Sequence, residues 1–253
     1  MAIMFLALIS NLSAQQAQSG GLDEETLKKA NNPLASTKSV NVHNYVMPSL
    51  HGVPDASLNQ LIFRYAHPIG NFLLRASLPI VTTSGIGVGP TTGLGDASIF
   101  GIYSFSVGKG IQLGVGPSLT FPTGTNHLGA GKWQAGASAL IFIARSPFLQ
   151  IGSLVQWQMS FAGDDSRANV NLLTPQLFFI WQLGRGTYLR STGAWSFDLN
   201  SGNYNIPLGL GIGQVVKVNN VVFNLFAEPQ FSVAAKGVGQ PKFQVFVGFN
   251  TQF

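Results

Sequence analysis

Four histidines are the residues whose type could support acid–base or metal chemistry. His127 follows Asn126, and such a pair could support nucleophilic hydrolysis if a serine stood two residues from the histidine. No serine stands there. The other three, His43, His51 and His67, are too dispersed to form a set of zinc ligands. The histidines therefore indicate polar structural positions rather than a catalytic or zinc site.

The acidic pair Asp164 and Asp165 offers few oxygens for a calcium ion, which takes about six to eight. Adjacent side chains in a strand point to opposite faces, and in a loop two acids are solvated. Glycine recurs at Gly209, Gly211 and Gly213, but no helix follows, so this is not a phosphate-binding loop. In a strand, such glycines leave one face bare or allow close backbone approach. The sequence indicates no enzyme, no metal and no cofactor.

The remaining candidates are polar residues that a two-residue period places on one face of several strands. They are Arg64, Arg75, Arg190, Asp198 and Glu228, together with Gln156 and Gln176. A buried charge is tolerated when it is paired or hydrated, so these residues have two interpretations. They form either an ion-pair network that braces a narrow passage or a constriction that selects a solute. Three arginines against two acids favour anions only weakly.

The strand that organises the chain is its last stretch, Lys242–Phe253. One face carries Phe243, Val245, Val247, Phe249, Thr251 and Phe253, and the other carries Gln244, Phe246, Gly248, Asn250 and Gln252. Strict alternation over this length predicts a strand with one apolar and one mostly polar face. The same alternation is also compatible with an edge strand of a soluble sandwich, so the rest of the chain must decide.

The composition favours a barrel in lipid. Charged residues make up 9% of the chain, against about 25% in ordinary soluble domains. No stretch approaches the roughly 20 apolar residues of a membrane-spanning helix. The apolar residues are instead spread in short segments broken by glycine, asparagine and proline, as in a transmembrane barrel. The formal net charge is +5, but its basic residues are scattered singly, which argues against nucleic acid as a partner.

Alternation and turn residues predict an all-β, membrane-spanning, antiparallel up-and-down barrel of about 12 strands. The expected strands are 37–48, 56–66, 70–81, 96–107, 110–121, 133–145, 147–161, 170–184, 186–198, 202–217, 219–233 and 241–253. Tight connections follow the even-numbered strands and mostly longer ones follow the odd-numbered strands. Short turns at one rim and long loops at the other are typical of outer-membrane barrels, where the short turns are periplasmic.

The pleat assigns the two faces of each strand. The glutamine-rich face cannot lie in hydrocarbon with unmet donors and acceptors, so we expect it to line the lumen. Aromatic residues near strand ends are expected to form an interfacial girdle. These are Trp133, Trp157, Trp181, Trp195, Tyr45 and Tyr188.

The chain is divided into three parts. Residues 1–14 are predicted to be a cleaved signal peptide, with an apolar run at Ile3–Ile9 and a small residue at Ala14, although basic residues are missing before the run. Residues 15–36 are predicted to be a periplasmic segment. Its short helix, Leu22–Asn31, has acids first and lysines last. This helix is either a peg in the periplasm or a plug at the barrel mouth. Residues 37–253 are predicted to be the barrel.

Several segments together resemble a known family. They are Asn32–Ala35, Gly114–Lys132, Ser160–Asn171, Thr174–Gln176 and Ile206–Val215, and the most specific part is Pro122–Trp133. From about Leu27 to Phe253 the chain resembles outer-membrane barrel transporters, some named for the MetA pathway of phenol degradation and others labelled neuromedin U. The resemblance implies a porin-like channel for small, often hydrophobic, compounds, without naming the permeant. A final aromatic residue also resembles the assembly signal of outer-membrane barrels, which implies that role for Phe249 and Phe253.

Two functions remain open at this stage. The first is a passive channel or transporter for small molecules in the outer membrane of a Gram-negative bacterium. Its partners would be the lipid bilayer, the barrel-assembly machinery and a small permeant. The second is a closed barrel with a packed lumen that acts as an outer-membrane enzyme or as a loop-based binding protein. The oligomeric state is left open.

Overall fold

The structure, a computed structural model, describes residues 22–84, 89–125 and 128–253. The predicted signal peptide and the His127 candidate therefore lie outside the described residues. Within those ranges the elements are α2 (Glu24–Ala30), β1 (Ser39–Leu50), β2 (Ser57–Ile69), β3 (Phe72–Ser84), β4 (Thr91–Leu94), β5 (Ser98–Gly108), β6 (Ile111–Thr120), β7 (Lys132–Ile143), β8 (Leu149–Gly163), β9 (Asn171–Gly184), β10 (Thr187–Ser191), β11 (Ser196–Asp198), β12 (Tyr204–Gly209), β13 (Gly211–Val218), β14 (Val221–Lys236) and β15 (Pro241–Gln252). No helix among them is long and apolar enough to cross a membrane.

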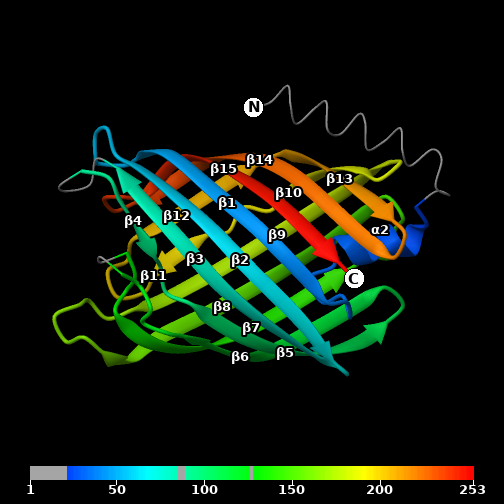
Figure 1. Ribbon diagram of the computed structural model, residues 1–253, viewed down its shortest axis with the longest axis horizontal. Coiled ribbons are helices and arrows are strands. Elements are labelled where there is room, and N and C mark those ends of the chain that lie inside the picture. The colour runs from blue at the N-terminus through cyan, green and yellow to red at the C-terminus, as the bar shows by residue number, and fades with distance from the viewer. Residues whose placement is uncertain (1–21, 85–88, 126–127) are drawn as a thin grey trace.

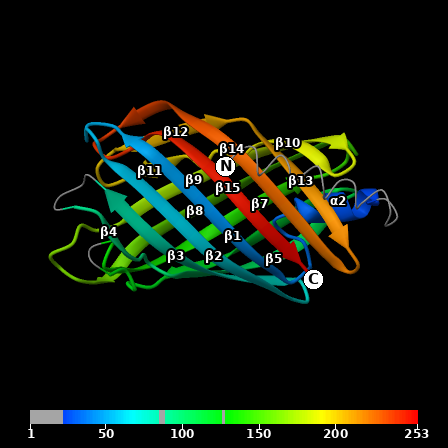
Figure 2. The same cartoon turned by 45° about the horizontal axis from the view of Figure 1, so that its top comes forward.

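All fifteen strand segments in the described ranges belong to one antiparallel sheet, which closes because β15 pairs with both β14 and β1. Three of the barrel strands are each interrupted once, so that two consecutive segments pair with the same neighbouring strand. Segments β4 and β5 both pair with β3; β10 and β11 both pair with β9; and β12 and β13 both pair with β14. The segments thus form twelve strands, and the predicted antiparallel barrel is confirmed. Figures 1 and 2 show the strands tilted across its wall.

The interruptions of the ninth and tenth strands lie next to one buried acid, Glu228. Between β10 and β11, the backbone N–H of Thr192 donates to Glu228 Oε1 at 2.7 Å. Between β12 and β13, the chain passes opposite Pro229, which has no N–H to donate to a neighbouring strand. The predicted strands 186–198 and 202–217 are continuous, because neither effect is visible without the positions of the neighbouring strands.

The two faces of the wall differ as the alternation predicts. Phe63, Leu78, Val155, Trp157, Met159, Leu177 and Phe249 are among the large apolar side chains exposed on the outside. Gln134, Gln150, Gln214, Gln230 and Gln244 are buried on the inside. In β15 the expected inward residues Gln244 and Phe246 are buried, whereas Phe249 is exposed. An apolar outer surface over a polar interior is the arrangement that a lipid environment requires.

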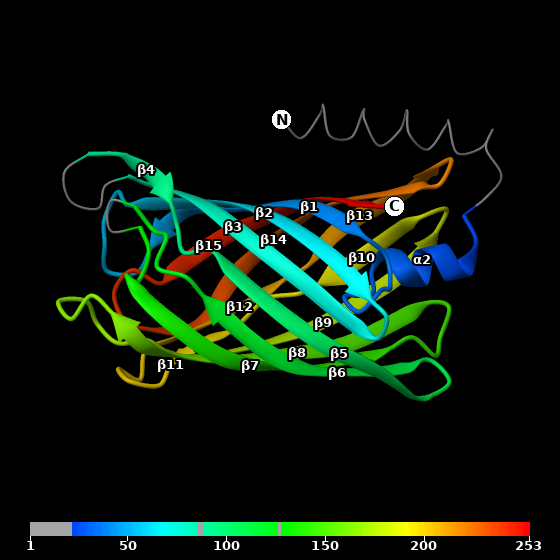
Figure 3. The ribbon, with the colours of Figure 1, turned by 60° about the horizontal axis from the view of Figure 1, so that its bottom comes forward.

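The two ends of the barrel differ in their connections. The end that carries α2 and the C-terminus has two-residue turns at 70–71, 109–110, 185–186 and 219–220 and a longer connection at 144–148 (Figures 1 and 3). The opposite end has connections at 51–56, 121–131, 164–170, 199–203 and 237–240. The N-terminal helix therefore lies at the short-turn mouth.

Candidate functional site in the barrel lumen

The barrel encloses a cavity of about 570 Å³ lined by residues from many strands and from the N-terminal segment. Its polar lining includes Gln156 and Gln176, two of the residues predicted to face the lumen. Gln156 Nε2 donates to Ser138 Oγ at 3.3 Å, and Gln176 Nε2 donates to the carbonyl of Thr192 at 2.7 Å. These amides are therefore partly used in bracing the wall.

The helix α2 begins at Asp23, whose carboxylate accepts a 2.6 Å hydrogen bond from the backbone N–H of Thr26. Hydrogen bonding from Thr26 lowers the pKa of Asp23 below its ordinary value. The last helical residue, Ala30, packs against the inner wall with Tyr188 and Phe226. Asn224 fastens this end by donating from Nδ2 to the Ala30 carbonyl at 3.2 Å. The C-terminal end of this helix therefore contacts the inner wall of the barrel.

Leu34 anchors the N-terminal segment to the inner wall of the barrel. Its side chain is 2% exposed and packs in a cluster with Ile102, Leu140, Phe142, Leu154 and Phe178. These partners belong to β5, β7, β8 and β9, whereas the cluster of Ala30 is formed by β9, β10, β13, β14 and β15. The two clusters share β9 and otherwise use different strands, so the segment from Ala30 to Leu34 connects two sides of the inner wall. We call residues 30–37 the plug segment.

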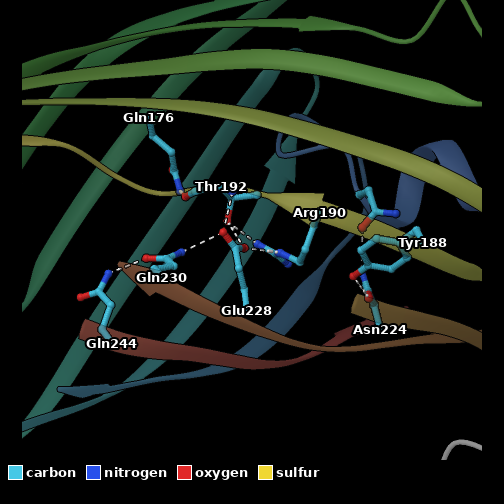
Figure 4. Close-up of polar contacts among 9 residues, drawn as sticks. Gln176, Tyr188, Arg190, Thr192, Asn224, Glu228, Gln230 and Gln244 are labelled. Atoms are coloured by element: carbon cyan, nitrogen blue, oxygen red, sulfur yellow. Dashed lines mark hydrogen bonds and ion pairs between the residues drawn. The ribbon is translucent and has the colours of Figure 1, made fainter. Parts of the chain in front are cut away.

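Arg190 and Glu228 lie at the centre of a buried network on β10 and β14 (Figure 4). Arg190 Nε donates to Glu228 Oε2 at 2.8 Å. Thr192 Oγ1 donates to the same oxygen at 2.7 Å, and Gln230 Nε2 donates to Oε1 at 2.9 Å. The guanidinium carbon of Arg190 lies 3.5 Å from the centre of the Phe226 ring. Glu228 is thus fully bonded and Arg190 is paired.

Two aromatic residues expected in the interfacial girdle point into the lumen instead. Tyr188 is fully buried and its hydroxyl donates to Asn224 Oδ1 at 2.6 Å (Figure 4). Tyr45 lines the cavity and stacks on Phe246 with ring centres 4.2 Å apart. The girdle prediction is wrong for both tyrosines, because it used position along the strand and not the face. Trp133, Trp157 and Trp181 are exposed on the outer face.

Lumen-facing glycines make room for these rings. A Cβ on Gly213 would lie 2.2 Å from the Tyr188 ring, and one on Gly248 would lie 2.1 Å from the Phe226 ring. Both glycines pair across the sheet with the residue whose ring they accommodate. Glycine at these positions therefore permits close approach of aromatic rings inside the lumen, as the alternating glycines suggested.

Arg64 lies on β2 and contacts β1 rather than an acid. Its Nη1 lies 2.6 Å from His43 Nδ1, and His43 Nε2 lies 2.8 Å from Asn250 Oδ1. A guanidinium group only donates, so Nδ1 accepts and the ring proton is on Nε2. His43 is therefore neutral, and its hydrogen bonds to Arg64 and Asn250 orient the Arg64 guanidinium. Sequence reasoning had treated His43 only as a dispersed histidine, although the alternation with Asn41 and Tyr45 places it on the inner face.

Arg75 on β3 points at the plug segment. Its Nη2 donates to the Pro33 carbonyl at 3.3 Å, and its guanidinium carbon lies 5.0 Å from the centre of the Phe100 ring. Its Nε is buried and has no hydrogen-bond partner among the described residues. Neither Arg64 nor Arg75 forms an ion pair with any of the described residues. The structure thus separates the three predicted lumen arginines into one paired and two unpaired.

The acid predicted beside them, Asp198, lies apart from this group. It sits at the end of β11, where its carboxylate accepts hydrogen bonds from the backbone N–H of Asn200 at 2.9 Å and from the hydroxyl of Ser201. The carboxylate on the cavity lining is Asp96, which sequence reasoning did not single out. It accepts from the N–H groups of Gly124 and Ala130 at 2.9 and 2.6 Å, so it holds the 121–131 loop.

The remaining predicted residues occupy other parts of the barrel. Asp164 lies in the exposed 164–170 loop and accepts two hydrogen bonds from Ser166. No cluster of three or more potential metal ligands occurs within the described ranges. Phe249 stacks on Phe223 on the outer face, and the backbone N–H of Phe253 donates to the Lys38 carbonyl at 3.0 Å.

A second cavity of about 630 Å³ opens beside the plug segment at the short-turn mouth. Four basic residues line it, namely Lys28, Lys29, Lys109 and Arg145, against one acid, Glu25. Lys29 pairs with Glu25 at 2.7 Å on the surface of α2. The approach to the plug from this end is therefore predominantly basic.

No protein-family model and no curated protein matches the sequence. Solved structures match its fold at low sequence identity. The COG4313 outer membrane channel from Pseudomonas putida F1 has a TM-score of 0.66 and 15% identity, over 86% of this chain and 96% of that one. The chain has the fold of an outer-membrane barrel. The NanC porin follows with a TM-score of 0.53, 7% identity and coverages of 85% and 98%. The KdgM porin, solved with disordered oligogalacturonate, has a TM-score of 0.52 and 10% identity, over 85% of this chain and 99% of that one.

Proposed function

We propose that the protein is a channel of the Gram-negative outer membrane through which small molecules diffuse. The observation that carries this proposal is the cavity of about 570 Å³ with polar lining inside a closed barrel whose outer face is apolar. Pocket volumes in this range accommodate small ligands. The fold shared with the COG4313 channel and the NanC and KdgM porins supports it. So does the resemblance of several segments to barrel transporters of the phenol-degradation type.

In this proposal the short-turn end faces the periplasm, and the chain is exported with a cleaved signal at residues 1–14. The plug segment narrows the periplasmic mouth in the conformation described above, because Ala30 and Leu34 pack in two clusters on different sides of the inner wall. Passage then requires the plug segment to move. Its few polar anchors, from Asn224, Gln112, Arg75 and Gln252, permit such a movement more readily than a fully bonded strand would.

The buried contacts of Leu34 also favour a second candidate, a permanently closed barrel that acts through its loops or as an enzyme. Reconstitution of the full-length protein in planar lipid bilayers distinguishes the two. A channel gives stepwise single-channel currents. A correctly folded barrel that stays silent at all voltages contradicts the channel and supports the closed barrel.

A further inference from the structure

We propose that Arg64 and Arg75, with His43 as the residue that positions Arg64, form a binding site in the lumen for a small organic carboxylate with an apolar body. This proposal deepens the proposed channel function and rests on it only for the conclusion that the bound molecule is a permeant. The argument depends on three features of the cavity: its unpaired cations, its apolar rings and the charge of its lining.

The two guanidinium groups lack counter-charges. The described residues include the ion pairs Lys29–Glu25 on the surface and Arg190–Glu228 in the wall, and neither Arg64 nor Arg75 belongs to one. No carboxylate of the described residues lies within 4.0 Å of their guanidinium nitrogens, although both arginines line the same cavity and are only partly exposed. Partly desolvated charges are stable when they are paired or hydrated. A carboxylate entering the cavity would supply the missing partner.

Most donors of these two arginines are also unused. A guanidinium group carries five N–H donors. Arg64 makes its hydrogen bond to His43, and Arg75 makes a long one, 3.3 Å, to the Pro33 carbonyl. The Nε of Arg75 is buried without a partner. Because His43 is held in turn by Asn250, the fork of Arg64 is oriented before any ligand arrives. Such fixed forks suit bidentate recognition of a carboxylate.

Apolar rings lie next to the cations. Phe100 lies under the Arg75 guanidinium, and Tyr45 lines the cavity on the same face of β1 as His43; both rings are partly exposed. His43 contacts the buried rings of Phe226 and Phe246 edge-on, at 5.7 and 5.2 Å between ring centres, and these rings fix its position. An inorganic anion would leave the exposed surface of Phe100 and Tyr45 unused. A carboxylate with an apolar body uses both the guanidinium forks and the rings.

The charge of the surroundings supports an anion. The carboxylate on the cavity lining, Asp96, is bound to backbone N–H groups of the 121–131 loop and forms no ion pair with either arginine. The neighbouring cavity at the short-turn mouth is lined by four basic residues and one acid. A lumen with an excess of fixed positive charge concentrates anions, because the field is strong inside a narrow low-dielectric passage.

The experiment measures binding of benzoate to the full-length barrel in detergent micelles by equilibrium dialysis. Benzyl alcohol, which has the same ring and no charge, is the ligand control for partition into detergent. We expect benzoate to bind about tenfold or more tightly than benzyl alcohol, the difference expected for hydrogen bonds to a charged group. Equal binding of the two compounds overturns the proposal, with no variant needed.

The variant is Arg64→Gln/Arg75→Gln, and Arg185→Gln is its matched control. Arg185 lies exposed in a turn, and its substitution removes one positive charge outside the cavity, against two inside it in the double variant. We expect the double variant to lose about tenfold or more of its benzoate affinity and Arg185→Gln to lose none. Unchanged affinity in a folded double variant overturns the site. Folding is checked by the shift in gel migration between unheated and heated samples.

The dialysis result is independent of conductance, so the two proposals fail separately. A barrel that conducts but binds benzoate and benzyl alcohol equally supports the channel proposal and contradicts the carboxylate site. A folded barrel that does not conduct but binds benzoate through Arg64 and Arg75 supports the site and contradicts the channel proposal.

Discussion

Arg190 and Glu228 form a buried ion pair 2.8 Å long that joins β10 to β14 inside the barrel wall. Glu228 is 0% exposed and also accepts from Thr192 and Gln230. An arginine so placed is a brace, since its charge is paired and it donates to Glu228 and Thr192 within the wall. Arg64 and Arg75, with no acid beside them in the described residues, are the cations left to act on a solute.

We therefore predict that Arg190→Ala lowers stability without changing ion selectivity. The variant leaves a buried carboxylate without its counter-charge, and breaking one side of a buried pair costs about 3–5 kcal/mol. The measurements are the free energy of unfolding in urea, with the barrel in lipid vesicles, and the reversal potential in a salt gradient.

The control for this prediction is the double variant Arg190→Ala/Glu228→Gln, which removes the unpaired charge and is expected to regain part of the lost stability. Arg190 lines the cavity, so a shifted reversal potential in Arg190→Ala, with unfolding unchanged, would mean that its charge acts on passing ions and that it is not a brace.

Alternation along the strands was sufficient to predict the barrel and the inward face of Gln156, Gln176 and the three arginines, because side-chain direction has a period of two residues. It was not sufficient to pair those residues. Arg190 and Glu228 are brought together by the neighbouring positions of β10, β13 and β14, whereas Asp198 on the same face lies at the rim. Pairing depends on strand register, which a single sequence does not show.

The two misplaced tyrosines show the same limit. Tyr45 and Tyr188 lie near strand ends, where an interfacial belt is expected. Because side chains alternate between the two faces of a strand, both tyrosines point inward, Tyr45 over Phe246 and Tyr188 over Gly213. The glycine that accommodates Tyr188 lies 25 residues away on another strand, as their cross-strand pairing shows. The role of Leu34 was equally hidden, because a single leucine after Pro33 has no periodic pattern that marks it as buried.

The last residue of the chain gives a prediction about assembly. Phe253 is 55% exposed beyond the end of β15, and its backbone N–H donates to the Lys38 carbonyl. We predict that Phe253→Gln slows insertion into the outer membrane while leaving the inserted barrel as stable as the parent. Pulse-labelling followed by the heat-dependent gel shift measures the rate of insertion. Phe148→Gln, at an exposed turn phenylalanine, is the control, and equal slowing in both variants would exclude a terminal signal.

The 164–170 loop is predicted to be sensitive to acid. Asp164 Oδ1 accepts from the hydroxyl of Ser166 at 2.7 Å and from its N–H at 2.9 Å, and these bonds lower the pKa of Asp164. A lowered folded pKa means that the contribution is present above the unfolded value of about 3.9 and is lost as pH falls through the folded pKa.

Amide exchange at Ser166 measures this contribution. We expect protection to fall below about pH 4 and to be low at all pH values in Asp164→Asn. Asp165→Asn removes the same charge from the same loop and is the matched control. Protection that stays constant from pH 6 to pH 3, roughly the range spanning the carboxylate pKa, would show that the Asp164 carboxylate does not hold this turn.

The final prediction concerns the plug segment and the glycine beneath it. A Cβ on Gly114 of β6 would lie 2.5 Å from Ile102 Cγ2 and 3.0 Å from Leu34 Cδ2, so this glycine makes room first for Ile102 and then for Leu34 packed beside it. We predict that Gly114→Ala shifts Ile102 against Leu34, loosens the packing of Leu34 and raises the fraction of time that the channel is open. Single-channel recording of the full-length protein measures this fraction directly.

The matched control is Gly101→Ala on the neighbouring strand β5, where an added Cβ would meet only Leu74 at 3.8 Å within 4 Å. Both variants add one methyl group to a glycine inside a strand, so general effects on the strand are the same in each. A rise in open time for Gly114→Ala alone assigns gating to the Leu34 contact. Equal open times in the two variants, with both barrels folded, would mean that the plug segment does not gate the lumen through Leu34.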